Sequence, residues 1–318
     1  MSHDRTPYGT ALEALRAARA VVPHTDADGL AAGALALRFR GESAEPAVLL
    51  GRGKTPFGAA KLPAGELAVL DWGMRQGGPP GLIVDHHAPE AEPRDDQVLV
   101  SGFGERPEVS TSVLVARIVP EPPMWLAAMG AFGDLGTAAF SLPGLEQAPA
   151  GPIRRLTPLI NAPRRLPDGP VREALALLVD HPDAASALRD PRIQILREAK
   201  EEWTAAYKQA LRTPPQMRGD LALIRFTSPY QIHPLVAQAW KRRLAPRVVL
   251  VANDEYLPGK VNFVVRGGTG DLRKLLRHAL PDVQGEYAHG HPAATGGSLG
   301  PETFERLLDA LAGSELVP

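Results

Sequence analysis

The chain contains no cysteine, and this absence excludes disulfide bonds and thiolate metal sites. Any bound metal ion would therefore be held by histidine and carboxylate side chains. Long hydrophobic runs are also lacking, because none approaches the roughly 18 apolar residues of a membrane-spanning helix. The N-terminal residues MSHDRTPYGT show no basic region followed by an apolar one, so no secretory signal is expected. We therefore expect a cytoplasmic protein that does not bind membranes.

An excess of charge of one sign is missing as well. The 35 lysines and arginines nearly balance the 36 aspartates and glutamates, which gives a formal net charge of −1. This balance argues against a broad basic surface that grips long nucleic acid without sequence preference, and it leaves room for a local basic groove. With 318 residues the chain is too long for one ordinary core, so two domains are expected.

Strand patterns alternate with helix patterns in the first part of the chain. Short apolar runs bounded by glycine, proline and charged residues are typical of buried strands, and they occur at 20–22, 47–50, 66–71, 81–85 and 97–102. Helix patterns occur at 11–20, 30–39, 110–119 and 124–135. The alternation predicts an α/β fold with a doubly wound, mainly parallel sheet. Ligands bind such sheets at the carboxyl ends of the strands.

A second, smaller α/β domain is predicted after a long helix. Residues 141–170 are rich in proline and predict short helices and loops, and residues 192–212 have one long helical pattern. The alternation then restarts with strands at 220–227, 247–252 and 260–266, helices at 232–244, 271–280 and 301–312, and a glycine-rich loop at 285–300. We interpret residues 191–213 as a helix that connects the two domains.

Acidic and imidazole side chains gather where predicted strands and helices end. His24, Asp26 and Asp28 lie in HTDADG, Asp71 in AVLDWG, Asp85, His86 and His87 in VDHH, and Asp134 in GAFGDLG. One aspartate in such a place is most often a helix cap, and His86 alone could be a core histidine. Four motifs at converging strand ends instead predict a site for a divalent ion such as Mn²⁺, which accepts histidine nitrogen and carboxylate oxygen. A carboxylate that bridges two ions roughly 3.5–4 Å apart is the usual design for displacement at phosphorus.

These four motifs, in this order, resemble those of the DHH phosphoesterases. The segment YAHGHPAATGGSLG (287–300) resembles the glycine-rich histidine loop of the DHHA1 domain that accompanies them, and LINAPRRL (159–166) resembles a segment of RecJ-type exonucleases. The resemblance spans nearly the whole chain. It implies a DHH metal-binding catalytic domain at 1–190 and a DHHA1 substrate-binding domain at 214–318.

The resemblance also implies a two-metal centre. His24, Asp28 and Asp71 would hold one Mn²⁺ ion, and Asp71, His86, Asp134 and Asp26 would hold the other, with Asp71 as the bridge and Mg²⁺ as the alternative metal. Asp26, Asp71 and His87 would be catalytic, with His87 in contact with the scissile phosphate. Several relatives carry a further aspartate where this chain has Leu30, which leaves the role of Asp26 open.

The predicted second domain and its approach supply the candidate substrate residues. Arg266 precedes two glycines at a strand end, where a guanidinium can fork onto a phosphate or form a surface ion pair. Gly290, Gly296 and Gly297 allow a close approach of backbone to ligand. His291 is the best match for the family's loop histidine, and Arg165 matches the arginine that faces the substrate groove in RecJ. The basic run WKRRLAPR (240–247) is interpreted as a solvated helix face.

The expected function is that of a RecJ-like exonuclease. Such a phosphodiesterase would use two Mn²⁺ ions to hydrolyse single-stranded DNA or RNA, or short oligonucleotides, to nucleoside monophosphates. RecJ enzymes carry a further oligonucleotide-binding domain, and none is expected after Pro318, which favours short substrates. A nanoRNase or pAp phosphatase, a cyclic-dinucleotide phosphodiesterase, a non-catalytic nucleic-acid-binding relative and an inorganic pyrophosphatase are the alternatives. The oligomeric state, monomer or homodimer, stays open.

Overall fold

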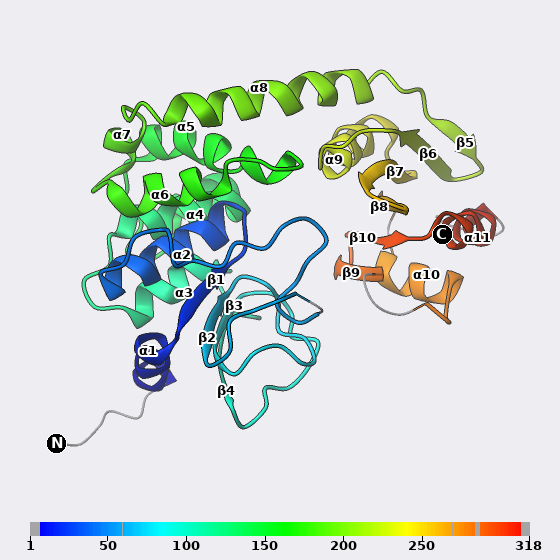
Figure 1. Ribbon diagram of the computed structural model, residues 1–318. Coiled ribbons are helices and arrows are strands. Elements are labelled where there is room, and N and C mark those ends of the chain that lie inside the picture. Colours follow the sequence, from blue (N-terminus) through cyan, green and yellow to red (C-terminus); the bar gives the residue numbers. More distant parts are fainter. Residues whose placement is uncertain (1–6, 59, 269, 284–286, 313–318) are drawn as a thin grey trace. The chain divides into compact units, whose positions relative to one another are not determined.

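The computed structural model describes residues 7–58, 60–268, 270–283 and 287–312, without the side chains of Pro7, His289, His291 and Ala312. The chain divides into two compact units (Figure 1). Unit 1 comprises Met1–Arg164 and Asp168–Lys200, and unit 2 comprises Arg165–Pro167 and Glu201–Pro318. Each unit has its own sheet and its own hydrophobic core.

The sheet of unit 1 has four parallel strands in the order β1-β2-β3-β4. They are β1 (Ala20–Pro23), β2 (Leu67–Leu70), β3 (Gly81–Asp85) and β4 (Gln97–Ser101). Every residue of the first three strands is buried, as the continuous apolar runs predict for a parallel sheet. The α/β class and the parallel sheet expected from the sequence are therefore confirmed.

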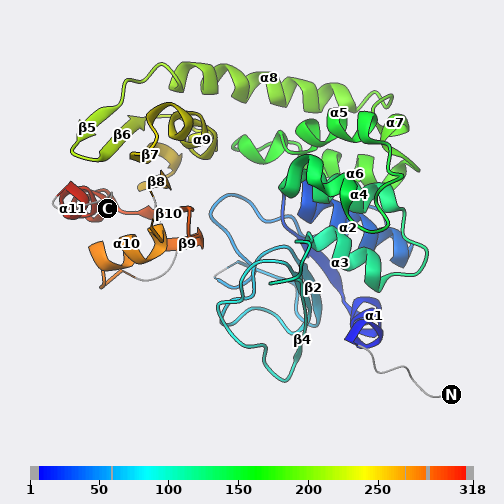
Figure 2. The same cartoon turned by 180° about the vertical axis from the view of Figure 1, so that it is seen from behind.

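Helices cover one face of this sheet, and segments without regular secondary structure cover the other (Figures 1 and 2). Helices α1 (Pro7–Ala17), α2 (Ala27–Arg40) and α3 (Thr111–Ile118) pack on the first face. On the opposite face Val22, Val69 and Ile83 pack against the segment that contains Val48 and Phe57. A doubly wound sheet has helices on both faces. This sheet has them on one face, because the described residues form no helix in the short connections after β2 and β3.

The strand predicted at residues 47–50 is not a strand. This segment has no regular secondary structure, and although the backbone N–H of Val48 donates to Val21 O, the pairing does not continue into a ladder. Its apolar residues are explained by their position over the sheet face rather than within the sheet.

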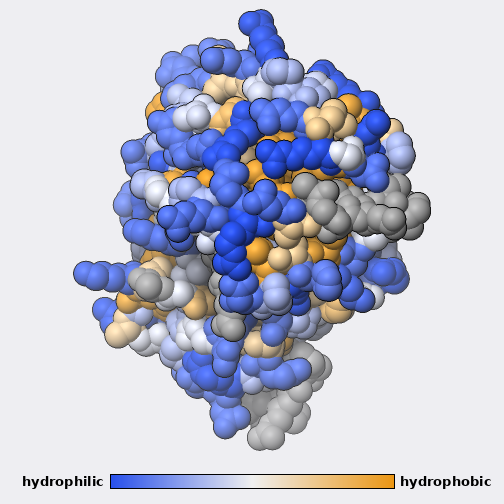
Figure 3. Space-filling model, turned by 90° about the vertical axis from the view of Figure 1, so that its right-hand side faces the viewer, coloured by the Kyte–Doolittle hydropathy of each residue, from blue (hydrophilic) through white to orange (hydrophobic). Residues whose placement is uncertain are grey.

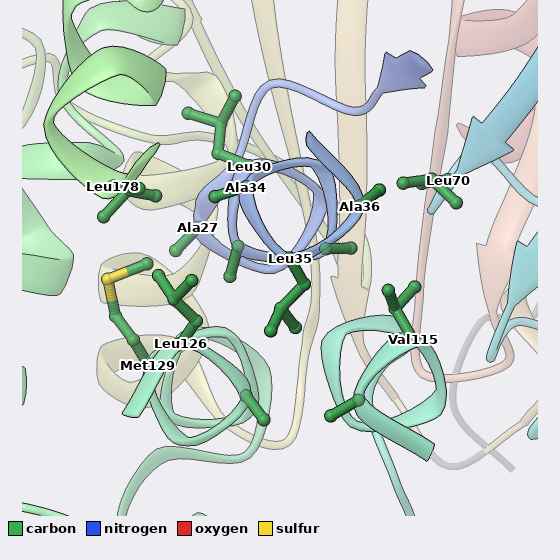
Figure 4. Close-up of a cluster of buried hydrophobic side chains, with 14 of the residues drawn as sticks. Ala27, Leu30, Ala34, Leu35, Ala36, Leu70, Val115, Leu126, Met129 and Leu178 are labelled. Carbon is green, nitrogen blue, oxygen red and sulfur yellow. The ribbon is translucent and has the colours of Figure 1, made fainter. Parts of the chain in front are cut away.

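Helix α2 lies at the centre of the core of unit 1 (Figure 4). It packs against α3, α4 (Met124–Leu135) and α6 (Val171–Asp180), and its residues from Ala27 to Leu37 are all buried. Alanine and glycine at many of its positions let the neighbouring helices approach closely. Asp26 caps its N-terminus, and Gly41 ends it with a left-handed backbone at φ 68°.

Gly130 of α4 allows the closest of these approaches. A Cβ atom there would lie 2.2 Å from Ser112 Oγ and 2.5 Å from Asp28 Oδ1. We expect Gly130→Ala to lower the free energy of unfolding by about 1–3 kcal/mol, because the added methyl group overpacks the contact. Gly151→Ala is the matched control, since Gly151 is also helical and its Cβ would meet nothing within 4 Å. Urea unfolding of both variants checks the prediction, and equal stabilities would contradict it.

The remaining helices of unit 1 lead to the long helix α8. They are the 3-10 helices η1 (Gly136–Ser141) and η2 (Pro163–Arg165), and helices α5 (Ala150–Ile160) and α7 (Ala184–Ala187). Helix α8 (Ile193–Ala210) starts in unit 1, with Ile193 and Leu196 in its core, and continues into unit 2, where Trp203 and Tyr207 pack. The long helix predicted at 192–212 is thus present.

Unit 2 has a six-stranded mixed sheet in the order β5-β6-β7-β8-β10-β9. Its strands are β5 (Gln216–Arg218), β6 (Leu221–Phe226), β7 (Val248–Leu257), β8 (Lys260–Gly267), β9 (Tyr287–His291) and β10 (Ala294–Leu299). Among these described strands, β6 and β7 pair in parallel and the other pairs are antiparallel. Helix α9 (His233–Leu244) packs with Trp203 on one face, and α10 (Leu272–Ala279) and α11 (Pro301–Ala312) pack on the other.

The glycine-rich loop predicted at 285–300 is a β-hairpin over its described residues. Strands β9 and β10 pair antiparallel, and β10 also pairs with β8. Gly296 lies opposite Val264, where a Cβ would come within 2.2 Å of Phe263 O, so glycine here permits close packing of strands. Glycine content alone is a turn signal, and it therefore misled the prediction.

No helix among the described residues is long and apolar enough to cross a membrane. On the face shown in Figure 3, hydrophilic residues surround smaller apolar patches.

Candidate metal centre

The carboxyl ends of β1, β2 and β3 bring three of the four motifs to one edge of the parallel sheet. His24 follows β1 directly, and its backbone N–H donates to Leu70 O of β2 (2.9 Å). Asp71 follows β2, and its backbone N–H donates to Val84 O of β3 (3.0 Å). The strands therefore end in step, and the side chains that follow them lie beside one another.

Asp71 occupies the middle of this edge and is buried. Its Oδ2 lies 3.6 Å from His24 Nδ1, and its Oδ1 lies 3.6 Å from His86 Nε2. Thr111 Oγ1 donates a hydrogen bond of 2.9 Å to the same Oδ1. The backbone of Asp71 has φ 69°, a left-handed conformation that few residues other than glycine, asparagine and aspartate adopt. The two oxygens of one carboxylate thus face two different histidines.

The potential ligand atoms form three overlapping groups, and within each group they lie within 4.8 Å of one another. The groups are His24–Asp26–Asp71, Asp28–His86–Asp134 and Asp71–His86–His87. The structure therefore brings together all the residues that the four motifs offered as ligands. The grouping differs from the one implied by the family resemblance, because Asp26 joins His24 and Asp28 joins His86.

Asp26 combines a structural and a site position. Its Oδ1 accepts from the Gly29 N–H (3.1 Å) and caps α2, whereas its Oδ2 lies 2.8 Å from His24 Nδ1. Arg164 Nη1 donates to this same Oδ2 at 3.1 Å. Burial alone would raise the pKa of the Asp26 carboxyl, but His24 and Arg164 outweigh that effect and hold the pKa well below its usual value.

Asp28 is held by the N-terminus of α3. Its Oδ2 accepts from the Thr111 N–H (2.7 Å) and its Oδ1 from the Ser112 N–H (3.0 Å), and the residue is buried. Free N–H groups at a helix N-terminus favour an anion. The polar residues Ser110 to Ser112 at the start of the predicted helix 110–119 are a sequence signal for this contact.

Asp85, the acid of the VDHH motif, orients its neighbours rather than joining a ligand group. Its Oδ2 accepts from the Gly73 N–H, and its Oδ1 accepts from the His87 N–H (2.6 Å) and lies 3.0 Å from His87 Nδ1. Burial raises the pKa of Asp85, but the hydrogen bonds from His87 and Gly73 outweigh it, so the pKa is lowered. The same contact with Asp85 outweighs the effect of burial on the imidazole and raises the pKa of His87.

Asp134, at the end of α4, completes the second ligand group. Its Oδ2 lies 3.5 Å from His86 Nε2, and 29 % of its side chain is exposed. Withdrawal of the carboxyl from water and the nearby Asp28 and Asp26 carboxyls raise the pKa of Asp134 to about 9. Burial, followed by the charges of Asp26 and Asp28, also raises the pKa of Asp71 well above its usual value. Negative charge is therefore in excess at this edge.

The donor atoms fit a pair of divalent cations. Carboxylate oxygens and imidazole nitrogens without sulfur suit Mn²⁺ or Mg²⁺ better than softer metals. His24 Nδ1 is buried and lies 2.8 Å from Asp26 Oδ2 and 3.6 Å from Asp71 Oδ2. Imidazole nitrogen and carboxylate oxygen at these separations are placed so that one divalent cation could contact all three side chains. The positive charge of a bound cation would offset the mutual repulsion of these carboxylates and so lower the raised pKa values of Asp71 and Asp134.

The raised pKa of Asp134 predicts a pH dependence of stability when divalent ions are chelated. The folded protein retains a proton on Asp134 that the unfolded chain loses near pH 4. The stability that depends on this protonated carboxyl is therefore complete at low pH and is lost as pH rises through about 9. We expect the melting temperature of the wild type in chelator to fall between pH 6 and about 9, and Asp134→Asn to flatten this slope. Calorimetry across this range checks the prediction, and equal slopes would contradict it.

Two further residues reach the site from the NAPRR segment. Asn161 Oδ1 accepts from the Ala27 N–H (2.9 Å) in the first turn of α2. Arg164 contacts Asp26 and, through Nη2, lies 3.5 Å from His24 Nε2. Arg164 was not among the residues predicted for the site, and its contacts with Asp26 and His24 place it in the candidate metal centre.

Arg165 belongs to unit 2. Its guanidinium carbon lies 5.2 Å from the centroid of the Trp203 ring, and its Nη1 donates to Gln231 O (3.0 Å). The Gln231 N–H donates to Arg165 O in return (2.9 Å). These two hydrogen bonds hold Arg165 against the segment that precedes α9.

The other predicted substrate residues lie on three adjacent strands of unit 2. Arg266 of β8 pairs with Ala294 of β10, and its Nη1 donates to Gln238 Oε1 (3.0 Å). Gly296 shares that face of the sheet with Arg266, whereas Gly297 lies opposite Phe263 on the other face. Gly290 of β9 has φ 110°. The backbone of His291 ends β9, and its side chain lies outside the described part of the chain.

Comparison with known proteins assigns the fold. No protein-family model and no curated protein matches the chain. Solved structures do match, and the fold they define is that of RecJ and other DHH-domain proteins. The expected resemblance to the DHH phosphoesterases is thereby confirmed for the fold.

Three structures illustrate this similarity. An exonuclease RecJ bound to manganese is 20% identical, with a TM-score of 0.60, and the alignment covers 96% of this chain and 93% of that one. RecJ from Thermus thermophilus in complex with Mn²⁺ is 18% identical, with a TM-score of 0.66, and this chain covers 55% of its length. The pGpG-specific phosphodiesterase PggH from Vibrio cholerae is 14% identical over 92% of this chain and 97% of that one, with a TM-score of 0.51.

Proposed function

We propose that this chain is a phosphodiesterase that uses two divalent metal ions to hydrolyse single-stranded nucleic acid or short oligonucleotides to nucleoside monophosphates. One observation carries the proposal. The two oxygens of Asp71 face His24 and His86 at 3.6 Å each, and each of these histidines belongs to a separate group of potential ligands. A carboxylate placed in this way suits a bridge between two ions.

Six residues would hold the ions. They are His24, Asp26, Asp28, Asp71, His86 and Asp134. Two bound divalent ions supply Lewis acidity toward phosphoryl oxygens and a water of lowered pKa. We favour Mn²⁺ because the ligand groups contain imidazole, and RecJ structures contain Mn²⁺ or Mg²⁺.

His87 would contact the substrate. The Asp85 carboxylate accepts from the His87 backbone and lies 3.0 Å from its Nδ1, so the ring is oriented and Nε2 is the nitrogen that would meet a ligand. The raised pKa of His87 favours the imidazolium, which can donate a charge-assisted hydrogen bond to a phosphoryl oxygen. In unit 2, Arg266, Arg165 and the glycines of the β9–β10 hairpin are the residues that we propose for substrate binding.

A short substrate is favoured over a long one. The near-zero net charge supplies little sequence-independent attraction for long nucleic acid. A solved structure named as a pGpG-specific phosphodiesterase matches 92% of this chain, and this similarity supports a linear dinucleotide as the second candidate substrate.

A panel of substrates tests the proposal. Purified protein would be incubated with Mn²⁺, Mg²⁺ or chelator and with labelled DNA and RNA from dinucleotides to about 30 nucleotides, together with pGpG, cyclic dinucleotides, pAp and pyrophosphate. We expect nucleoside monophosphates from single strands, turnover that rises as strands shorten, and none in chelator. Cleavage of pyrophosphate alone, or of no substrate in either metal, would contradict the proposal.

A further inference from the structure

Arg164 places a fixed positive charge inside the candidate metal centre. Its guanidinium donates from Nη1 to Asp26 Oδ2 at 3.1 Å, and its Nη2 lies 3.5 Å from His24 Nε2. The side chains of Arg164 and Asp26 are only 21 % and 20 % exposed, so water screens their interaction incompletely. The contact joins residues that are 138 positions apart in the chain.

The bond to Asp26 uses an oxygen that a metal ion would need. The other oxygen of Asp26 is engaged by the Gly29 N–H in the cap of α2. Oδ2 is the oxygen that faces His24 Nδ1 at 2.8 Å and so belongs to the His24–Asp26–Asp71 group. A divalent ion in this group must share Oδ2 with the guanidinium or displace it, and two cations on one oxygen repel each other.

The contact with His24 acts in the same direction. A guanidinium donates and never accepts, so a neutral His24 that faces it uses Nε2 as the acceptor and carries its proton on Nδ1. Nδ1 is the nitrogen that faces Asp26 and Asp71, and a metal ligand must be unprotonated there. Histidine ligands ordinarily donate their other N–H to an acceptor, and here a donor stands in that place.

We propose that Arg164 is an internal cation that competes with the divalent ion for the His24–Asp26–Asp71 group and so makes the two metal positions unequal. The Asp28–His86–Asp134 group fills first, and the His24–Asp26–Asp71 group fills only at higher metal concentration, when the guanidinium is displaced. The inference rests on the metal centre of the proposed function and concerns how its occupancy is controlled. Activity would accordingly follow the concentration of free metal ion.

Metal binding without substrate tests this inference. Free Mn²⁺ would be measured by electron paramagnetic resonance during titration of the wild type, Arg164→Gln, Arg164→Lys and the control Arg155→Gln. Arg155 is an exposed arginine of α5, so its replacement makes the same change of net charge away from the centre. We expect the wild type to have one tight and one weak class of Mn²⁺ site. In Arg164→Gln the affinity of the weak class should rise about tenfold or more, whereas that of the tight class should not change.

The variants Arg164→Lys and Arg155→Gln show whether the effect comes from the charge at position 164. Arg164→Lys keeps the charge and should stay close to the wild type, and Arg155→Gln should not differ from it. Melting in chelator provides a second readout, in which Arg164→Gln should be less stable than the wild type, with the difference reduced in excess Mn²⁺. If Arg164→Gln leaves the weaker class unchanged or weakens it further, the inference is wrong while the proposed centre stands. If the wild type and all variants bind no Mn²⁺, the proposed function fails with it.

Discussion

Asp71→Asn should abolish metal-dependent hydrolysis, with a fall in kcat/KM of about 10³-fold or more, or about 4 kcal/mol of transition-state stabilisation. The amide keeps an oxygen for the hydrogen bond from Thr111 but removes the charge that lies between His24 and His86. An amide nitrogen cannot bind a cation, so one carboxylate oxygen is lost to one of the two ions. We expect the variant to bind at most one Mn²⁺ ion tightly.

The same substitution should stabilise the protein when divalent ions are chelated. The pKa of Asp71 is raised by burial and by the surrounding aspartates, so the ionised carboxylate destabilises the fold, and asparagine removes that charge. Asparagine also tolerates φ 69°, which makes it a better choice than alanine. Asp95→Asn, at an exposed aspartate between β3 and β4, is the control. A variant that hydrolyses substrate as fast as this control would show that Asp71 is not the bridge.

His87→Asn should lower kcat by about 10²–10⁴-fold while leaving the number of bound Mn²⁺ ions unchanged. His87 is directed by Asp85 and carries a raised pKa, both of which suit a donor to phosphate better than a metal ligand. His86→Asn should behave differently, because burial and the neighbouring His87 lower the pKa of His86 and keep its imidazole neutral for metal binding. We expect that variant to lose one ion.

Mn²⁺ content and single-turnover rates, measured on the same preparations, separate the two histidines. His278→Asn, which changes an exposed histidine of α10, is the control for loss of an imidazole elsewhere. If His87→Asn loses an ion, His87 is a ligand of the Asp71–His86–His87 group instead. If His87→Asn retains both ions and full activity, its role in substrate binding is excluded.

The parallel sheet could be predicted because each strand is short, apolar and ended by a charged or polar residue. Runs at 20–22, 66–71, 81–85 and 97–102 correspond to β1 to β4 within one or two residues. The run at 47–50 has the same local composition, and only its position over the sheet face distinguishes it from a strand. The hairpin at 287–299 was missed because glycine signals a turn locally, whereas here it permits close pairing of strands.

The membership of the site could be predicted because strand ends in a parallel sheet meet at one edge. The motifs at His24, Asp71 and His86 each follow a strand directly, so their convergence needed no knowledge of distances. The role of Asp85 and the exchange of Asp26 with Asp28 could not be predicted in this way. They depend on which backbone N–H each carboxylate accepts from, as with Asp85 and the His87 N–H or Asp28 and the Thr111 N–H. Such side-chain directions are set by tertiary packing and not by the local sequence.

Contacts between distant segments account for the remainder. The approach of Arg164 to Asp26 and the space that Gly130 leaves for Asp28 both depend on the packing of helices from separate parts of the chain. The boundary between the two units could not be predicted from the sequence either. It falls inside the uninterrupted helix α8, between Lys200 and Glu201, where no composition change marks it.

Anomalous X-ray diffraction from crystals of the full chain grown with Mn²⁺ would locate the bound metal ions. If Asp71 bridges two ions, we expect two anomalous peaks roughly 3.5–4 Å apart, with the Asp71 carboxylate between them, one beside His24 and the other beside His86. A single peak that does not contact Asp71, or no peak at the carboxyl edge of β1 to β3 under saturating Mn²⁺, would contradict the bridging role of Asp71.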